Sequence, residues 1–310
     1  FALALFASAA SAIAGDILYV TNSDAETVSV IDGEKGVVIR EVKVGIEPCD
    51  IVIDPKGDTI AVSHEEKQGE VWFLNRKDLR VQGRTALVDE KDGRAGCFFL
   101  AFSRDSKKLY AANRYSGLLF VVDARKSNVV KKISLRHGED FRLEGAVLSP
   151  DGAFLYLPNS VGREILVVDV MKDKALEPIT LDGDVSALAV SPDGGRLYVA
   201  NGLGPALDVI DIKTKAVIKR IPIGNQPAGI AVSRDGSFIF VSNKISYDVD
   251  KIDALLLKKA ANIPVGMYAI GIAVSADGKK VYVCNYNENT VSVIDAVTAK
   301  EILRVATAFT

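Results

Sequence analysis

The 310-residue sequence has few of the side chains that most often carry chemistry: two histidines, three cysteines, two methionines and one tryptophan. It contains no GxSxG, HExxH, P-loop, EF-hand or strand-linked GxGxxG pattern, which argues against the common hydrolase, zinc-protease and nucleotide-binding classes. Helical periodicity is nearly absent. The formal net charge is only −2, so charge favours neither nucleic acid nor an anionic membrane as a partner.

The sequence has instead an internal repeat. The stretch LYVTNSDAETVSVID at 18–32 returns near the other end as YVCNYNENTVSVID at 282–295. A polar residue that ends the YVTN-like run marks each unit, and these markers are Asn22, His64, Asn113, Asn159, Asn201, Asn243 and Asn285. They are 42, 49, 46, 42, 42 and 42 residues apart, a period typical of propeller blades.

Each unit contains four strand-like runs, for example 229–233, 238–243, 247–253 and 259–266. Ser-x-Asp-Gly sequences between the first two runs predict tight hairpins in which Gly adopts positive φ. We therefore predict an all-β fold, a seven-bladed β-propeller of four-stranded antiparallel blades over residues 15–310, with each first strand lining the axis. The repeated Asn, and the Asp that closes each third strand, are interpreted as turn-forming residues.

The tetrapeptide Tyr19-Val20-Thr21-Asn22 and its variants at 198–201 and 282–285 resemble the YVTN family of β-propeller repeat proteins. The resemblance extends over roughly residues 17–306. It implies the propeller architecture and an exported protein of bacterial or archaeal type. The family's repeat residues are structural, so the resemblance implies no catalytic or binding residue.

Residues 1–14, FALALFASAASAIA, form an apolar and then small-residue run without charge. This run is too short to span a membrane and is typical of the end of a secretory signal peptide, with cleavage after Ala12 or Ala14. An ordinary N-terminal strand is the alternative. We expect a periplasmic or extracellular protein whose mature chain is monomeric and has no membrane span.

Blade one has no innermost strand in the repeat alignment. Either the native chain continues beyond Thr310 to supply it, or Ala9–Ala14 fills the place, since this segment aligns with 272–277. We expect the structure to show the second arrangement and the processed protein to use the first, because a cleaved signal peptide cannot complete a blade.

The three cysteines have no metal-binding spacing. Cys284 replaces a Thr or Ala of the repeat and is interpreted as a small buried apolar residue. Cys49 and Cys97 both begin the first strand of a blade, in adjacent blades. A disulfide between them, a thiol near the axis and two unrelated cysteines all stay open, because the sequence cannot supply the geometry of a bridge.

Departures from the repeat indicate where a site is grafted onto the blades. Two insertions, at 85–96 and 136–143, lie in the connections that lead into the third and fourth blades. Both histidines belong to the same loop face. The candidate ligand-binding residues on it are His64, Arg94, Arg114, Tyr115, His137, Arg142, Glu144 and Arg163. We expect His64, Arg94, Arg114, His137, Arg142 and Glu144 to converge on one polar pocket. It would suit an anionic ligand or an acidic protein loop, because arginine binds carboxylate or phosphate through a bidentate fork.

Glu144 occupies the place of Ser186, Ala228 and Ile270 in later units, and Asp50 lies one step further along the equivalent strand. Such a carboxylate either coordinates a cation or pairs with a neighbouring arginine, and pairing is the favoured interpretation. Asp50 and Glu144 are thus weak metal candidates, and no cofactor is assigned. On the other side of the face, Tyr247, Tyr268 and Tyr286 could form aromatic walls for an organic ligand.

Two classes of function stay open. The favoured one is an exported, non-enzymatic propeller that binds a protein partner or a small anionic ligand through this loop face. The alternative is a metal- or cofactor-dependent propeller enzyme of lactonase type, or an accessory protein associated with a quinoprotein or haem. The sequence shows no catalytic residue that would favour an enzyme.

Overall fold

The computed structural model describes residues 17–65, 69–88, 98–135 and 141–307. Their strands form seven antiparallel sheets, six with four strands and one with three, and the only helix among them is the 3-10 turn η1 (Tyr286–Glu288). The predicted seven-bladed β-propeller is therefore confirmed. The chain divides into two compact units, one built mainly from blades two to four and the other from blades five to seven.

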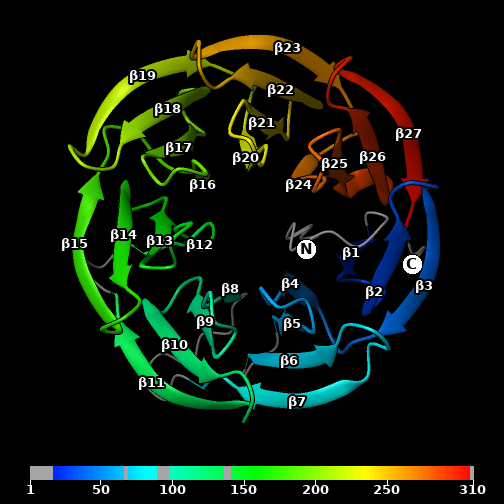
Figure 1. Ribbon diagram of the computed structural model, residues 1–310, viewed down its shortest axis with the longest axis vertical. Coiled ribbons are helices and arrows are strands. Elements are labelled where there is room, and N and C mark those ends of the chain that lie inside the picture. The colour runs from blue at the N-terminus through cyan, green and yellow to red at the C-terminus, as the bar shows by residue number, and fades with distance from the viewer. Residues whose placement is uncertain (1–16, 66–68, 89–97, 136–140, 308–310) are drawn as a thin grey trace. The chain divides into compact units, whose positions relative to one another are not determined.

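The first unit contains three four-stranded sheets with consecutive strands paired (Figure 1). Blade two consists of β4 (Pro48–Ile53), β5 (Thr59–His64), β6 (Glu70–Asn75) and β7 (Val81–Ala86). Blade three consists of β8 (Phe98–Phe102), β9 (Lys108–Asn113), β10 (Leu118–Asp123) and β11 (Asn128–Ser134). Blade four consists of β12 (Val147–Leu148), β13 (Phe154–Asn159), β14 (Glu164–Asp169) and β15 (Lys174–Thr180). The first strands of successive blades are neighbours, β4 beside β8 and β8 beside β12.

The second unit repeats this plan. Blade five consists of β16 (Ala187–Val190), β17 (Arg196–Asn201), β18 (Ala206–Asp211) and β19 (Ala216–Pro222). Blade six consists of β20 (Pro227–Val232), β21 (Phe238–Asn243), β22 (Asp248–Asp253) and β23 (Lys258–Pro264). Blade seven consists of β24 (Ala269–Val274), β25 (Lys280–Asn285), β26 (Thr290–Asp295) and β27 (Lys300–Ala306). Here too, the first strands β16, β20 and β24 are successive neighbours.

Blade one has three strands in the described chain, β1 (Ile17–Asn22), β2 (Thr27–Asp32) and β3 (Val37–Lys43). The missing innermost strand that the repeat alignment predicts is thus confirmed for these residues. Ala9–Ala14, the segment expected to fill the place, and the predicted signal peptide at 1–14 lie outside the described residues.

The core lies between the sheets. Neighbouring residues of one strand point to opposite faces, and in β9 Leu109 packs with Phe120 of its own blade and Phe73 of blade two. Tyr110, the next residue, packs with Leu155 and Leu166 of blade four. Both faces of the blade-three sheet are therefore apolar at β9, which explains why this strand does not alternate between apolar and polar residues.

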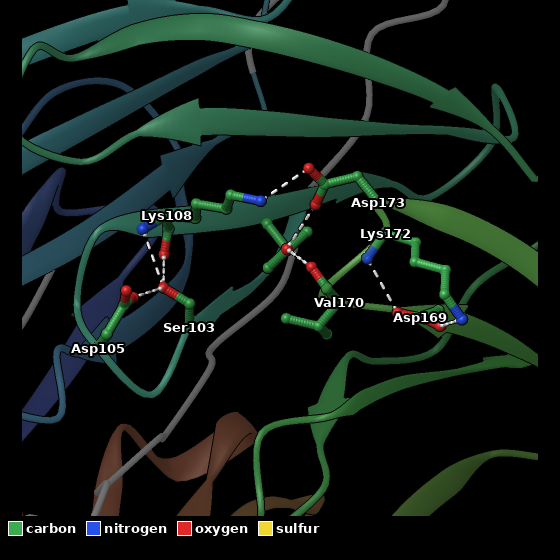
Figure 2. A network of polar contacts seen from close by, with 8 residues as sticks. Ser103, Asp105, Lys108, Asp169, Val170, Lys172 and Asp173 are labelled. Atoms are coloured by element: carbon green, nitrogen blue, oxygen red, sulfur yellow. Dashed lines mark hydrogen bonds and ion pairs between the residues drawn. The ribbon is translucent and has the colours of Figure 1, made fainter.

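Polar contacts join blades three and four at the edge of this core, as Figure 2 shows. The buried Tyr110 hydroxyl lies 2.8 Å from Asp173 Oδ1 and 3.1 Å from the Val170 carbonyl oxygen. Lys108 Nζ donates to Asp173 Oδ2 at 2.7 Å. Burial, and then the neighbouring Asp173 carboxylate, raise the pKa of Tyr110. The repeat tyrosine at this position therefore stays protonated and links two blades.

The turn chemistry predicted from Ser-x-Asp-Gly is confirmed. Ser275 Oγ donates to Asp277 Oδ1 at 2.7 Å and accepts the Lys280 N–H at 2.9 Å, so one hydroxyl closes the hairpin from both sides. The glycine takes positive φ in four copies: Gly152, Gly194, Gly236 and Gly278. The Asp that closes a third strand caps the next turn, as Asp123 Oδ1 does by accepting two backbone N–H groups.

Candidate functional site

Two clusters of loop side chains, one in each unit, are candidates for binding. The first lies where blade three meets blade four and contains several residues predicted from the sequence. Arg94 and His137, both in the insertions, lie outside the described residues. The cluster is therefore defined here by Arg114, Arg142 and Glu144, with Ser160 beside them.

Glu144 is the centre of this arginine cluster. Arg114 Nη2 donates to Glu144 Oε2 at 2.9 Å, and Arg142 Nε forms an ion pair with Glu144 Oε1 at 2.9 Å. Ser160 Oγ donates to the same Oε1 at 3.1 Å. The favoured interpretation, pairing with arginine, is what the structure shows for Glu144. Two guanidinium groups share one carboxylate, so these three side chains carry a net charge of +1.

Local backbone structure explains why Glu144 faces the loops. β12 is the shortest strand described, and before it only an isolated bridge joins Leu143 to Asn159. The Leu143 N–H donates to the Arg114 carbonyl, while the Glu144 N–H donates to the Pro158 carbonyl. The inner strand of blade four is thus interrupted at the residue where an apolar side chain would otherwise continue it.

Arg114 is held tightly but is not fully satisfied. Its guanidinium carbon lies 5.9 Å from the Phe99 ring centroid and 5.7 Å from that of Tyr115. Its Nε is buried and has no hydrogen-bond partner. An unpaired buried donor on a charged group costs free energy, and this N–H lies on the edge of the guanidinium that binds carboxylates side-on.

His64 does not join this cluster. Its side chain is 1% exposed, and Nε2 lies 2.7 Å from the Val44 carbonyl, so Nε2 carries a proton. A Cβ at Gly45 would lie 3.1 Å from His64 Nε2 and 2.9 Å from Trp72 Cζ2. The His64 ring packs at 5.0 Å from the Trp72 ring, on which Arg84 stacks at 3.7 Å. His64 thus fills the repeat Asn position as a packing residue.

Arg163, the last predicted residue, is exposed and adopts φ 51° in the loop after β13. Asp50, the second metal candidate, is buried: its carboxylate accepts the Ile51 N–H at 2.7 Å and the Leu100 N–H at 2.8 Å. Burial raises the pKa of Asp50 to about 7, although both hydrogen bonds act in the opposite direction. Among the residues that the structure describes, no group of three His, Cys, Asp or Glu could hold a metal ion.

The cysteines differ in state. Cys49 is disulfide-bonded, while Cys284 is free and buried, as the sequence predicted. Cys97, the partner considered for Cys49, lies outside the described residues. Burial raises the pKa of Cys284, so its thiol is unreactive in the folded protein.

The second cluster lies on the loops of blades six and seven. The Tyr268 and Tyr286 rings are 5.7 Å apart at a 44° tilt, and Lys244 Nζ is 5.0 Å from the Tyr268 centroid. Ile245, Tyr247 and Met267 are 44%, 41% and 45% exposed beside them in the sequence. The tyrosines were noted from the sequence, but Lys244 was missed, because no local pattern indicates that its side chain reaches Tyr268.

Tyr268 and Tyr247 have strained backbones for aromatic residues, with φ 65° and 56°. The repeat requires this left-handed conformation, since Gln226 has φ 50° at the position of Tyr268, and Gly117 and Asn289 have φ 67° and 51° at that of Tyr247. Bulky residues rarely adopt it. Two tyrosines therefore occupy loop positions where Gly or Asn would fold more easily.

Part of the chain matches one protein-family model. Residues 227–309 match the family model of the cytochrome D1 heme domain, and this range spans β20 to β27, the sixth and seventh blades. The match covers less than half of the chain, and the YVTN family stays a resemblance. A search of curated proteins finds no match to the sequence.

A solved structure shares the whole architecture. The chain is similar to a structure described as Kuenenia stuttgartiensis hydrazine synthase, with a TM-score of 0.79 and 20% identity, over 91% of this chain and 92% of that one. At this identity the similarity shows the propeller fold and nothing about the site. The described residues include no helix that is both long and apolar enough to cross a membrane.

Proposed function

We propose that this protein is a haem-associated propeller, an accessory protein that holds a haem-type tetrapyrrole rather than an enzyme with its own catalytic residues. The observation that carries the proposal is the match of blades six and seven to the cytochrome D1 heme domain model. The match supports the alternative function considered from the sequence, a haem-associated accessory protein, over the favoured one, a propeller that binds a protein partner or a small anion. The charge-free, apolar segment at 1–14 supports export in the same proposal.

The available side chains limit how a haem could be held. Proteins ligate haem iron through His, Cys, Met or Tyr. His64 is buried against the Val44 carbonyl, and Cys284 is buried with a raised pKa. Neither fits as an axial ligand, and His137 is outside the described residues. Of these ligand types in the second unit, the exposed or partly exposed residues are Met267, Tyr247, Tyr268 and Tyr286. Among the described residues of the second unit, these side chains lie on the loops of blades six and seven, where we place the haem.

Haem titration tests the proposal. The purified protein is titrated with ferric haem while absorbance in the Soret region is recorded. We expect saturable binding with one haem per chain and an unchanged affinity in the His64→Asn variant, because His64 is a packing residue. A linear, non-saturating response of the wild-type protein would reject the haem-associated function.

A second candidate function is anion binding at the arginine cluster, and the two guanidinium groups that share one carboxylate favour it. The cluster's net positive charge and the half-exposed Arg142 suit inorganic phosphate or a small dicarboxylate such as succinate. Calorimetric titration with each anion tests it. The Arg142→Ala variant, whose wild-type side chain is 49% exposed, should weaken binding while its Tm stays within a few degrees of wild type; normal binding by that variant would exclude the cluster.

A further inference from the structure

The loops of blades six and seven form a surface with a defined shape. The Tyr286 N–H donates to the Tyr268 carbonyl at 3.1 Å, which ties the blade-seven loop to the connection before β24. The Val265 N–H donates to the Tyr247 carbonyl at 3.0 Å, which ties the same connection to the blade-six loop. The aromatic residues of three loop segments are thus held together by backbone hydrogen bonds, and the surface is preorganised.

The side chains of this surface are of three kinds: aromatic rings, one lysine and exposed apolar groups. Tyr268 and Tyr286 are partly exposed, and a tilted aromatic pair can present the face of one ring and the edge of the other to a planar ligand. Lys244 Nζ lies 5.0 Å from the Tyr268 centroid and can pair with an anion beside the rings. Met267 and Ile245 add exposed apolar area. A planar conjugated molecule with carboxylates at its edge complements all of these features.

The side chain at position 268 departs from the repeat. Tyr268 has φ 65° at a position where blade two has Glu47, with φ 47°, and blade six has Gln226, with φ 50°. The left-handed backbone is therefore a property of the repeat, and the fold does not require a tyrosine there. Folding alone does not explain the aromatic side chain at this position.

We infer that Tyr268 and Tyr286 contact a tetrapyrrole, one ring stacking on the ligand plane and the other, tilted by 44°, meeting it at an angle, and that a carboxylate of this ligand pairs with Lys244. The inference rests on the proposed function and specifies its site. Stacking and ion pairing involve the periphery of the ligand. Iron is therefore not required for binding, and an iron-free porphyrin should bind as haem does.

The test compares ferric haem with iron-free protoporphyrin IX, using Soret absorbance for the first and porphyrin fluorescence for the second. We expect similar Kd values for both ligands in the wild-type protein. Tyr268→Asn, which suits the left-handed backbone, and Tyr286→Leu should each raise both Kd values roughly tenfold. Lys244→Met should also raise both Kd values and should weaken their dependence on salt concentration. Leu255→Ala is the control and should bind as wild type, because Leu255 is 85% exposed in the turn between β22 and β23; melting curves check that each variant folds.

The outcomes separate the two claims. If the wild-type protein binds haem and all three variants bind it equally well, the haem-associated function stands and this site is wrong. If haem binds but the iron-free porphyrin does not, iron ligation holds the ligand and the stacking inference is overturned. If neither ligand binds the wild-type protein, the proposed function and the inference fall together.

Discussion

Asp50 in the first unit and Gly229 in the second occupy the same position of the repeat, two residues after the prolines that begin β4 and β20. In the first unit the Asp50 carboxylate accepts the Leu100 N–H of the next blade. In the second, the backbone of the next blade comes so close that a Cβ on Gly229 would lie 2.5 Å from the Ile270 carbonyl oxygen. The same seam between inner strands is therefore closed by a buried acid in one unit and by direct backbone approach in the other.

The loop clusters differ in a parallel way. In the first unit, charges satisfy one another around Glu144, with one guanidinium N–H left over. In the second, aromatic rings and one lysine form the surface. The arginine cluster, in which one of two positive charges is neutralised, contributes to stability more than to recognition, whereas the role proposed for the tyrosines is recognition, at a cost in stability. A charged side chain that departs from the repeat is thus interpreted as stabilising the fold. A bulky side chain at a position of left-handed backbone is interpreted as part of a binding surface.

The largest expected effect is the pH dependence caused by Asp50. Its pKa of about 7 lies above the ordinary 3.8, so between these values the folded state keeps a proton that the unfolded chain releases. The free energy of unfolding should therefore fall as pH rises from about 4 to about 7, by on the order of 2–4 kcal/mol. Asp50→Asn should remove most of this slope.

Denaturant unfolding followed by the fluorescence of Trp72, the single tryptophan, measures this slope in the first unit. Asp78→Asn alters a carboxyl group whose side chain is 49% exposed and is the matched control, which should retain the slope. An unchanged slope in Asp50→Asn would show that other groups carry the pH dependence.

Gly229→Ala should destabilise the contact between the inner strands β20 and β24 in the second unit. The added methyl group would meet backbone that cannot rotate away, and such overpacking costs about 1–3 kcal/mol. Gly204→Ala is the control, because its Cβ would be 3.8 Å from the nearest atom, Asn201 Oδ1. Thermal unfolding by circular dichroism measures both. Equal Tm values for the two variants would contradict the close approach.

Glu144→Gln sharpens the contrast between stability and recognition in the arginine cluster. The variant leaves two guanidinium groups without their shared carboxylate, in a site where the Arg114 and Glu144 side chains are 19% and 17% exposed. Full burial would cost 3–5 kcal/mol, and partial solvation reduces this to about 1–2 kcal/mol. Phosphate affinity should rise, because a competing anion is gone.

Glu301→Gln is the control for this variant, since Glu301 pairs with Arg304 at the surface and should cost less than about 1 kcal/mol. The two readouts are Tm and calorimetric phosphate binding. A stable Glu144→Gln protein with unchanged phosphate affinity would mean that the cluster serves neither stability nor anion recognition.

The fold could be predicted from the sequence because the repeat period, the turn glycines and the strand composition are local signals. The site could be predicted only in part. Glu144 was identified with its arginine partners, since a carboxylate in an apolar position is visible in an alignment of repeats. The packing role of His64 depends on Gly45 and Trp72, and the contact of Lys244 with Tyr268 depends on loop geometry. Neither relation leaves a pattern along the chain.

The smallest expected effect concerns Tyr247, which has φ 56° and is 41% exposed. Asn289 occupies the same position in blade seven with φ 51°, and asparagine tolerates this conformation far better than tyrosine. Tyr247→Asn should therefore raise the free energy of unfolding by about 0.5–1 kcal/mol. The reciprocal variant Asn289→Tyr should lower it by a similar amount, because it introduces the same strain one blade away. Chemical denaturation of both variants with a common m-value provides the measurement. If Tyr247→Asn is instead destabilising, the tyrosine side chain contributes more to the folded loop than its backbone strain costs, and the contrast between a stability cluster and a recognition cluster loses its basis at this position.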